Sequence, residues 1–435
     1  MNKNTDFKDF IKYVSQNVMS MIGLSCYILA DTFFIANGIG DKGLTALNLA
    51  IPVYSLVNGI GLMLGVGGAT KYAITRAQGQ KVEGNKIFTN MTYTALIIGA
   101  VFVVLGLFAS GRIAALLGAN QATYEMTDIY VKVIMLFSPI FLINNIINCF
   151  VKNDNNPSLA MFAMLCGCGF NIVFDYVFIF IAKLGMLGAV LATGFAPVVG
   201  LIVLSCHFIR KKNEFSITRE EIDFPTIKVA VQIGIPSLVT ELSSGIVIII
   251  FNLLILRIAR NVGVAAYGII ANISLVCLAI HTGIAQGIQP IISHAHGRGM
   301  RRRIANVYKY ALITAIALSL IMLAFLCINA DWVAMVFNRD QSPELQNIAV
   351  EGIYLYFTGI PFAGINIVLA SYFASVERAV PAQIVSLLRG FILIIPAVFV
   401  LSFGFGLVGV WLAFPIAEAL TTGMGFIVQY LQKST

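Results

Sequence analysis

Charged residues are scarce in this sequence, and their scarcity decides the class of protein. Asp, Glu, Lys and Arg together make up 11% of the 435 residues, whereas hydrophobic residues make up 59%. Soluble globular domains carry about 25% charged residues, so the composition excludes an ordinary water-soluble globule. The net charge of +8 is concentrated in loops, as described below, and does not indicate a nucleic-acid partner.

Motifs for nucleotide hydrolysis and for catalysis are absent as well. The glycines of Gly59–Gly68 are not followed by the Gly-Lys-Ser/Thr of a phosphate-binding loop, and their spacing predicts close helix packing. The seven cysteines all lie in apolar segments, which is typical of packing residues. No nucleophile with a neighbouring base falls at one depth of these segments. We therefore expect neither an enzyme nor a cofactor, and any transport must use an ion gradient.

Apolar windows of helix length recur along the chain. A bilayer-spanning helix needs about 20 apolar residues, and the windows lack the alternation of a membrane β-barrel. They cover residues 13–37, 47–72, 87–109, 129–151, 159–182, 185–209, 228–256, 264–292, 306–329, 349–374, 381–403 and 406–431. The sequence therefore predicts an all-α polytopic membrane protein with twelve transmembrane helices in two pseudo-symmetric lobes.

Lysine and arginine are distributed unevenly between alternate loops. Most of these 28 residues fall on the same side as the N-terminus, including the groups Arg210–Lys212 and Arg301–Arg303. Loops rich in Lys and Arg stay on the cytoplasmic side of a membrane. We therefore expect a multi-pass protein of the cell (inner or plasma) membrane with both termini in the cytoplasm. The basic loops are expected to contact anionic lipid.

The two halves of the chain carry related segments. Phe137–Asn144 resembles Gly359–Asn366, and Gly185–Ala192 resembles Gly406–Ala413. Because each half contains an even number of helices, both halves enter the membrane from the same side. Parallel repeats of this kind form transporters that bind substrate between two lobes.

The repeat also divides the chain. We expect a first lobe at 1–209 (helices 1–6), a cytoplasmic linker at 210–227 and a second lobe at 228–435 (helices 7–12). Within the linker region, Thr218–Glu221 has capping-box spacing and Pro225 suits the first turn of a helix. We therefore expect a short surface helix in the linker.

Asp31 is a bare carboxylate inside the first apolar window, and no neighbour in sequence carries a compensating positive charge. A charge at the centre of a membrane helix costs about 2.5–3.5 kcal/mol on insertion scales, which favours a functional role. Counting 1.5 Å per residue from the outer turns places Asp31, Asp175 and Thr193 about 10–12 Å deep. Asn171 lies one helical turn from Asp175, on the same face. We expect these four side chains to converge. Their oxygen atoms suit Na⁺, and two close carboxylates suit a proton.

These features resemble the multidrug and toxic compound extrusion (MATE) transporters over essentially the full chain. The resemblance rests on the two six-helix repeats, Asp31 before a Gly-rich outer loop, Asn171–Asp175, Gly185–Thr193 and the Gly-rich second and eighth helices. It implies that Asp31, Asn171, Asp175 and Thr193 form the family's first-lobe cation or proton site. Asp31 and Asp175 would ligate Na⁺ if Na⁺ is the coupling ion. It also assigns Asn148 as an accessory polar residue of that site.

Two carboxylates of the second half are candidates for substrate binding. Glu241 matches an acidic position in the seventh helix of some family members, but the Asp that accompanies it in the tenth helix is missing, since 354–375 contains no carboxylate. We therefore expect Glu241 to contact a cationic substrate, with a helix-packing role as the alternative. Glu418 is a second candidate for the same contact. Met63 is a candidate for lining an adaptable drug cavity, with packing as its alternative.

The sequence thus predicts a secondary active multidrug efflux transporter. An H⁺ or Na⁺ gradient would drive antiport of amphipathic, cationic small molecules by alternating access, and each charge moving down 100 mV contributes about 2.3 kcal/mol. We expect the chain to act as a monomer in the lipid. The alternative is a flippase for lipid-linked precursors in the same wider superfamily. A flippase would need a cationic groove for phosphate, whereas the intramembrane charges of the first lobe are acidic.

Overall fold

Helices account for all regular structure in the computed structural model, which describes residues 3–219, 221–338 and 342–431. Within these ranges, ten continuous helical stretches are long and apolar enough to cross a membrane. Two of the stretches contain a sharp backbone break, one at Arg260 (φ 54°) and one at Gly406 (φ 59°). Division at these breaks gives the twelve expected segments, so the predicted all-α polytopic fold is confirmed.

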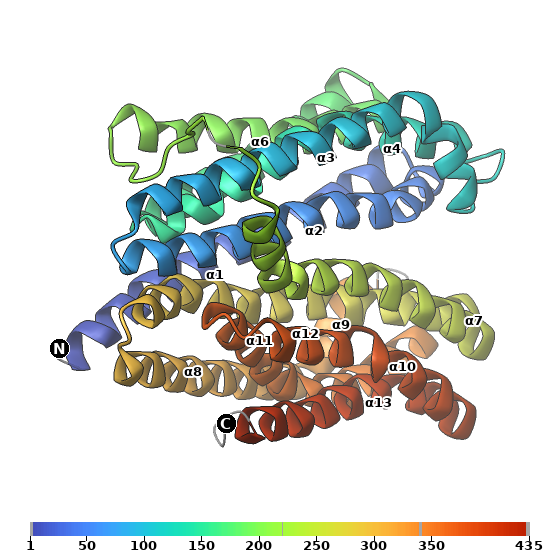
Figure 1. Cartoon of the computed structure of the whole chain (residues 1–435). Coiled ribbons are helices and arrows are strands. Elements are labelled where there is room, and N and C mark those ends of the chain that lie inside the picture. The colour runs from blue at the N-terminus through green and yellow to red at the C-terminus, as the bar shows by residue number, and fades with distance from the viewer. Residues whose placement is uncertain (1–2, 220, 339–341, 432–435) are drawn as a thin grey trace. The chain divides into compact units, whose positions relative to one another are not determined.

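The first half of the chain forms six of these helices (Figure 1). They are α1 (Lys3–Gly38), α2 (Asp41–Ala77), α3 (Lys81–Leu116), α4 (Tyr124–Asn153), α5 (Pro157–Tyr176) with the π-helical turn η1 (Val177–Ile181), and α6 (Gly185–Ile209). α4 packs against α2, α3 and α6, and α5 packs against α6. Every link is short, which keeps consecutive helices antiparallel.

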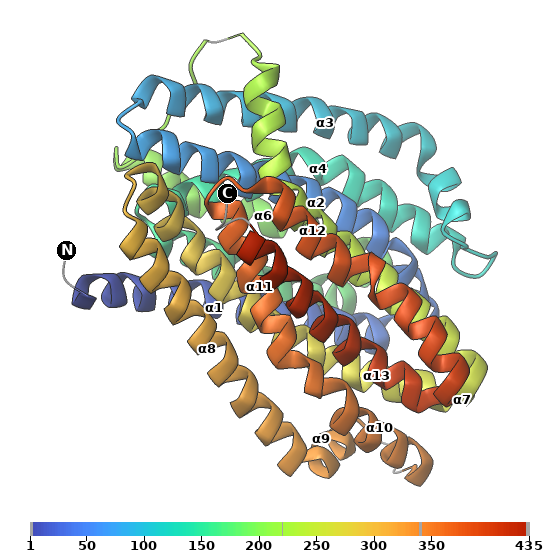
Figure 2. The ribbon, with the colours of Figure 1, turned by 60° about the horizontal axis from the view of Figure 1, so that its bottom comes forward.

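The second half contains more interrupted helices. They are α7 (Phe224–Gly297), α8 (Arg301–Ile328), α9 (Ala330–Phe337), α10 (Pro343–Tyr356), the 3₁₀ turn η2 (Phe357–Gly359), α11 (Ile360–Ser375), α12 (Ala379–Leu387), the π-helical turn η3 (Leu388–Ile392) and α13 (Ile394–Leu431). α11 packs against both α12 and α13, as Figure 2 shows.

The linker before α7 differs from the prediction. Pro225 does lie in the first turn of α7, which Asp223 caps by accepting a hydrogen bond from the Thr226 N–H at 3.5 Å. The expected surface helix is wrong for the described linker residues, which are extended or turned; position 220, inside the predicted capping box, lies outside the described residues. Side chains of α3 replace helical hydrogen bonds there. The Ser216 and Thr218 N–H groups donate to Asn85 Oδ1 (3.1 Å) and Thr89 Oγ1 (3.0 Å).

The chain separates into two compact units whose boundaries fall inside helices. Unit 1 comprises Met1–Val18, Ser243–Ile292 and Arg302–Thr435, and unit 2 comprises Met19–Leu242 and Ser293–Arg301. Both α1 and α7 therefore pass from one unit to the other. The lobe boundaries expected from the sequence repeat stay a prediction.

Within unit 1, the start of α1 is held by close packing and by charge. A Cβ added to Gly283 or Gly287 would lie 2.6 Å from the Val18 Cα or 2.7 Å from the Val14 Cα, so these helices touch through their backbones. Figure 1 shows this start of α1 at the N label. The guanidinium of Arg303 then pairs with the carboxylates of two residues of the first α1 turns, Asp6 (3.5 Å) and Asp9 (2.6 Å).

Within unit 2, the start of α7 meets α2 in the same manner. A Cβ on Gly67 would lie 1.9 Å from the Ala230 carbonyl oxygen, and one on Gly234 would lie 1.9 Å from the Met63 carbonyl oxygen. Small residues that allow backbones to approach this closely are the usual means of helix association in membranes. The glycine pattern of the second helix is thereby explained as packing.

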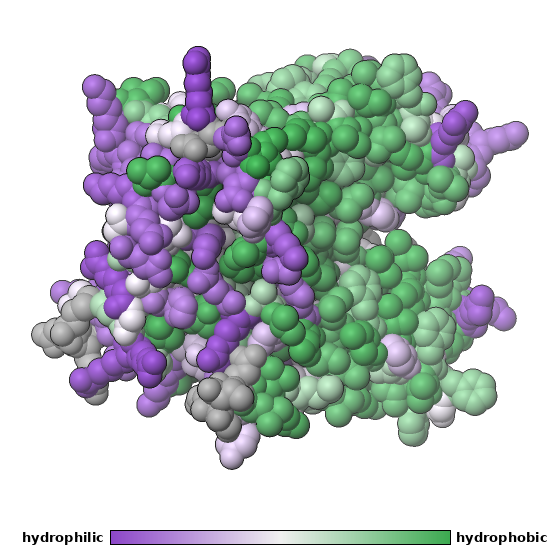
Figure 3. All heavy atoms as spheres, in the orientation of Figure 1, coloured by the Kyte–Doolittle hydropathy of each residue, from purple (hydrophilic) through white to green (hydrophobic). Residues whose placement is uncertain are grey.

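Hydrophobic side chains cover the middle of the helices and hydrophilic ones gather at their ends. Figure 3 shows this along α3, where a green band separates two purple ends. The exposed α3 side chains in that band include Leu96, Val101, Val104 and Phe108. This distribution is the one that a hydrocarbon layer about 30 Å thick requires.

A prediction concerns the contact between α2 and α7. Gly67→Ala should lower the stability of unit 2, because the new methyl group would overlap the Ala230 carbonyl oxygen, and overpacking costs about 1–3 kcal/mol. The melting temperature of the detergent-purified protein measures the effect. Gly169→Ala is the matched control, because a Cβ at Gly169 meets no atom within 4 Å. Equal melting temperatures for the two variants would contradict the proposed packing.

Candidate functional site

The C-terminal half of α1 rests on the end of α5, and this contact brings two carboxylates together. A Cβ on Gly38 would lie 2.3 Å from Ile179 Cγ2, so α1 approaches the π-helical turn closely. The ring of Phe34 packs against those of Tyr176 (6.2 Å between centroids) and Phe180 (6.1 Å). With the two helices fixed in this way, Asp31 on α1 faces Asp175 on α5.

Asp31 and Asp175 are both buried, with exposed fractions of 7% and 0%. Their carboxyl groups lie close enough to interact, yet the Oδ1 atom of each has no hydrogen-bonding partner. Among the described residues, no Lys, Arg or His forms a salt bridge with either carboxylate. Two carboxylates can share a hydrogen bond only if a proton lies between them, and a metal cation is the other means of holding them together. The pair is therefore built to bind one positive charge.

Asn171 and Thr193 complete this group, as expected from depth counting. With its amide oriented as its partners require, Asn171 donates to Asp175 Oδ2 (3.0 Å) and accepts from the Thr193 N–H (3.2 Å). Thr193 Oγ1 donates to the Ala189 carbonyl (3.2 Å). Both residues are buried. The structure thus brings together all four first-half side chains that the sequence predicted to converge.

Three tyrosines that lie beside the carboxylates were not predicted from the sequence. Tyr130 of α4 is buried and hydrogen-bonds Thr193. The Tyr27 and Tyr54 hydroxyl groups lie 3.0 Å apart, and both interact electrostatically with Asp31. Their phenol groups supply neutral hydrogen-bonding partners around the charge. Tyr27 lies one helical turn before Asp31, a spacing that could have indicated it. Tyr54 and Tyr130 could not be distinguished in this way, because the rotation of α2 and α4 about their axes decides which residues face Asp31.

The α5 backbone changes its pitch directly beyond the site. Val177–Ile181 forms a π-helical turn, in which the Ala182 N–H donates to the Val177 carbonyl at 2.8 Å. Turns of this kind inside α-helices occur frequently at functional sites. The turn begins two residues after Asp175, so it sets how that side chain meets α1.

Comparison with known proteins decides the family. A family model described as MatE matches residues 17–177 and 236–400, which include Asp31 and Asp175. The chain belongs to the MatE family. This family consists of transporters, so the protein is a multi-pass membrane transporter and not an enzyme.

Relatives and solved structures agree with this assignment. The chain is 25% identical to the multidrug export protein MepA of Staphylococcus saprophyticus over 99% of this chain and 95% of that protein. It is 26% identical, with the same coverage, to the protein of that name from Staphylococcus aureus strain MRSA252. A crystal structure of MATE in complex with MaL6 has the same fold, with a TM-score of 0.92 at 22% identity, covering 99% of this chain and 96% of that one.

Two further predicted site residues of this MatE protein lie elsewhere. Asn148 on α4 donates to the Ala160 carbonyl at 3.1 Å, and Ala160 precedes Asp175 by fifteen residues on α5, about 22 Å along a helix. The structure therefore does not bring Asn148 to the carboxylate pair. Met63 is buried in the core around Leu64 and Leu142, next to the α2–α7 backbone contact, which corresponds to its packing alternative.

Glu241 is the first of three polar side chains in unit 2 that are joined by hydrogen bonds. Its Oε2 accepts a hydrogen bond from Asn58 Nδ2 at 3.3 Å, and Asn58 Oδ1 accepts one from Asn145 Nδ2 at 2.9 Å. The Glu241 side chain is half-buried. α7, α2 and α4 thus each contribute one of these three hydrogen-bonded side chains. Glu241 is the one carboxylate among the three, and it is partly exposed.

Glu418 has a different setting from Glu241. It is 3% exposed and its Oε1 accepts hydrogen bonds from Arg389 Nη2 (2.8 Å) and Nε (3.2 Å). Its Oε2 accepts one from Asn366 Nδ2 at 2.6 Å, and Asn366 Oδ1 in turn accepts one from Thr422 at 3.0 Å. Both carboxylate oxygens are therefore occupied by the protein itself. Arg389 lies in the π-helical turn η3, and no feature of the sequence predicted its pairing with Glu418.

A prediction follows for the carboxylate pair. Asp31→Asn should abolish efflux-based drug resistance without lowering the melting temperature, because an amide can donate to the Asp175 carboxylate and remove one buried negative charge. Resistance in a drug-sensitive host, membrane abundance and melting temperature are measured together. Asp41→Asn, the same change at an exposed position, is the control and should leave resistance intact. Full resistance in the Asp31→Asn variant would contradict a role in coupling.

Proposed function

We propose that the protein is a secondary active multidrug exporter that exchanges amphipathic, cationic compounds for a cation bound at Asp31 and Asp175. The observation that carries the proposal is the contact between these two buried carboxylates with no basic partner. Its relatives named multidrug export protein MepA, aligned over 99% of the chain, support the substrate class. The proposal places both termini in the cytoplasm and the monomer in the cell membrane.

The coupling ion that the geometry favours is the proton. Asp31 and Asp175 lie close enough to interact directly, and a proton shared between two such carboxyl groups would remove their repulsion without further ligands. Na⁺ would have to draw on the two free Oδ1 atoms and the Thr193 hydroxyl. Binding of either cation neutralises the pair, and its release restores the repulsion between the carboxylates. Alternation between these states is the step by which a gradient would drive the exchange.

The cationic substrate is assigned to Glu241. This carboxylate is half-buried and accepts a hydrogen bond from the neutral amide of Asn58, and a carboxylate is the group expected to attract an organic cation. Met63 takes no direct part in this proposal, since it lies in a packed core. Glu418 is likewise left out, because Arg389 neutralises it.

A flippase for lipid-linked precursors is the second candidate, and the charges argue against it. One neighbour in fold is described as a transporter of the MOP superfamily from Pyrococcus furiosus whose reversed pocket polarity suggests a different function, with a TM-score of 0.91 at 22% identity. In this chain the half-buried Arg389 donates through two of its nitrogens to Glu418, so it offers no cationic groove for a phosphate.

Dye transport in vesicles tests the coupling ion. Purified protein reconstituted in liposomes should move an ethidium-like dye when a pH gradient is imposed, and the movement should disappear with Asp175→Asn. A Na⁺ gradient at equal pH on both sides is the parallel measurement. Dye movement with the Na⁺ gradient alone would show that Na⁺, and not the proton, is the coupling ion at this site. Movement with neither gradient would contradict the antiporter proposal.

A further prediction separates substrate binding from coupling. Glu241→Gln should raise the half-saturating concentration of cationic dyes about tenfold, the effect of losing roughly 1.4 kcal/mol, while a neutral substrate is transported as before. The amide keeps the hydrogen bond with Asn58 and the packing against Gly59. Glu83→Gln, an exposed change, is the control. An equal loss for charged and neutral substrates would contradict the assignment.

A further inference from the structure

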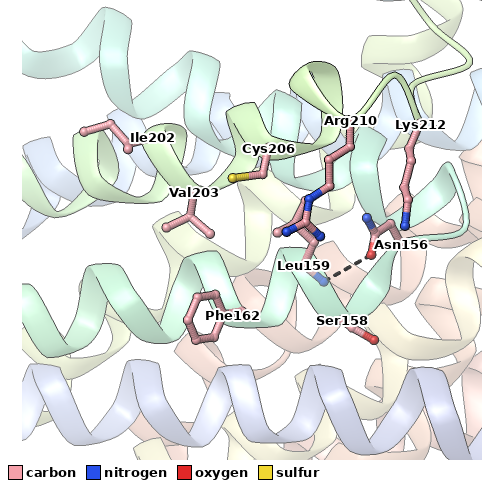
Figure 4. Close-up of a pocket in the computed structure, with 9 residues that line it drawn as sticks. All are labelled: Asn156, Ser158, Leu159, Phe162, Ile202, Val203, Cys206, Arg210 and Lys212. Carbon is pink, nitrogen blue, oxygen red and sulfur yellow. Dashed lines mark hydrogen bonds between the residues drawn. The ribbon is translucent and has the colours of Figure 1, made fainter.

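An open groove lies between α5 and α6 at the end of unit 2 that carries the linker. Its volume is about 490 Å³, and nine residues line it (Figure 4). Leu159 and Phe162 of α5 and Ile202 and Val203 of α6 form an apolar wall. Arg210 and Lys212 stand at the other end of the groove, and the lining contains no carboxylate.

The two cations are held by a fixed backbone. α6 ends in a Schellman motif, in which the Lys212 N–H donates to the His207 carbonyl (3.0 Å) and the Lys211 N–H donates to the Phe208 carbonyl (2.9 Å). The motif places Lys211 in the left-handed region (φ 51°), where glycine is the usual residue. Lys211 thus has a backbone conformation that is unfavourable for a residue with a side chain, and Arg210 and Lys212 flank it in the sequence.

Buried hydrogen bonds anchor this corner to α5. The His207 ring is 1% exposed, with Nε2 2.9 Å from Asp154 Oδ2 and Nδ1 3.2 Å from Asn156 Nδ2. Asn156 also caps α5, because its Oδ1 accepts from the Leu159 N–H at 3.3 Å, the dashed line of Figure 4. The helix N-terminus adds partial positive charge to the same end of the groove. Cation positions here are therefore set by structure and not by a mobile loop.

The apolar wall lies along the membrane-facing surface. Phe162 and Ile202 are 57% and 64% exposed, and Ile202 precedes Arg210 by eight residues, about 12 Å along α6. A ligand of the groove must therefore carry a negative charge at one end and a hydrocarbon chain at the other. An anionic phospholipid has this form, and its phosphate suits an Arg and a Lys together.

We propose that this groove binds one anionic phospholipid of the leaflet at the linker end, with the phosphate between Arg210 and Lys212 and an acyl chain along Phe162 and Ile202. The proposal concerns a lipid site and not transport, so it does not depend on the coupling ion. It differs from general attraction of basic loops to the membrane surface, because one lipid occupies one groove and excludes other reagents from it.

Cys206 reports occupancy, because it is partly exposed and lines the groove. In a variant with Cys206 as its single cysteine, a maleimide should react more slowly when phosphatidylglycerol is added to the detergent-purified protein. At ten times the half-saturating lipid concentration the expected slowing is about tenfold. Phosphatidylcholine with the same acyl chains should give no such protection, and neither should inorganic phosphate.

Two variants test the two ends of the site. Arg210→Gln with Lys212→Gln should remove protection by phosphatidylglycerol, whereas Arg219→Gln with Lys228→Gln, which removes the same charge from exposed residues outside the groove, should keep it. Ile202→Trp fills the apolar wall without changing charge and should also remove protection. Its exposed position keeps the helix packing intact, so it remains informative if the double variant fails to fold.

Several results would overturn the proposal. Equal protection by phosphatidylcholine would show that the groove does not select lipids by the negative charge of their headgroup. Protection by inorganic phosphate alone would show an anion site without a lipid. Undiminished protection by phosphatidylglycerol in both the Arg210/Lys212 variant and the Ile202→Trp variant would place the lipid elsewhere.

Discussion

The contact between the Asp31 and Asp175 carboxyl groups is the constraint on which the first-half site depends. Burying a carboxylate is costly unless a partner compensates for its charge. The chain provides such partners for its other deeply buried carboxylates: Asp154 has His207 and Tyr72, and Glu418 has Arg389. Asp31 and Asp175 have only each other and neutral groups. Their compensating charge must therefore come from solution, which is what a coupling site requires.

The helix that carries Asp31 also joins the two compact units. Residues up to Val18 belong to unit 1, where Arg303 and the α7 glycines hold them, and residues from Met19 onward belong to unit 2. α7 is divided in the reciprocal manner at Leu242 and Ser243. A change in the Asp31–Asp175 contact therefore acts on a continuous helix whose N-terminal end belongs to unit 1. α1 thus carries Asp31 on the same helix as residues that pack against α7 and pair with Arg303.

The sequence was sufficient for properties that depend on counting along the chain. Hydrophobic length located the twelve segments, and depth below the outer turns brought Asp31, Asn171, Asp175 and Thr193 to one level. It was insufficient where helix rotation decides the outcome. The tyrosines around Asp31 and the pairing of Arg389 with Glu418 depend on which faces meet, and Asn148 was assigned by resemblance to a level it does not reach. The prediction of a linker helix was wrong for another reason. Side chains of α3 accept hydrogen bonds from the linker N–H groups, in place of carbonyl groups of the linker itself.

Equivalent positions of the two repeats differ in their hydrogen-bonding partners. Asn144 and Asn366 occupy matching places in the repeat, yet Asn366 bonds Glu418 and Thr422, whereas Asn144 Oδ1 has no partner. In the second half this amide helps to lock a carboxylate that is already neutralised. In the first half, Asp31 and Asp175 form no salt bridge with any described basic residue, and Ile249 stands near the position in α7 that corresponds to Asp31. A repeat with two exchangeable sites would have to release two cations per cycle, whereas the proposed function needs only the one site at Asp31 and Asp175.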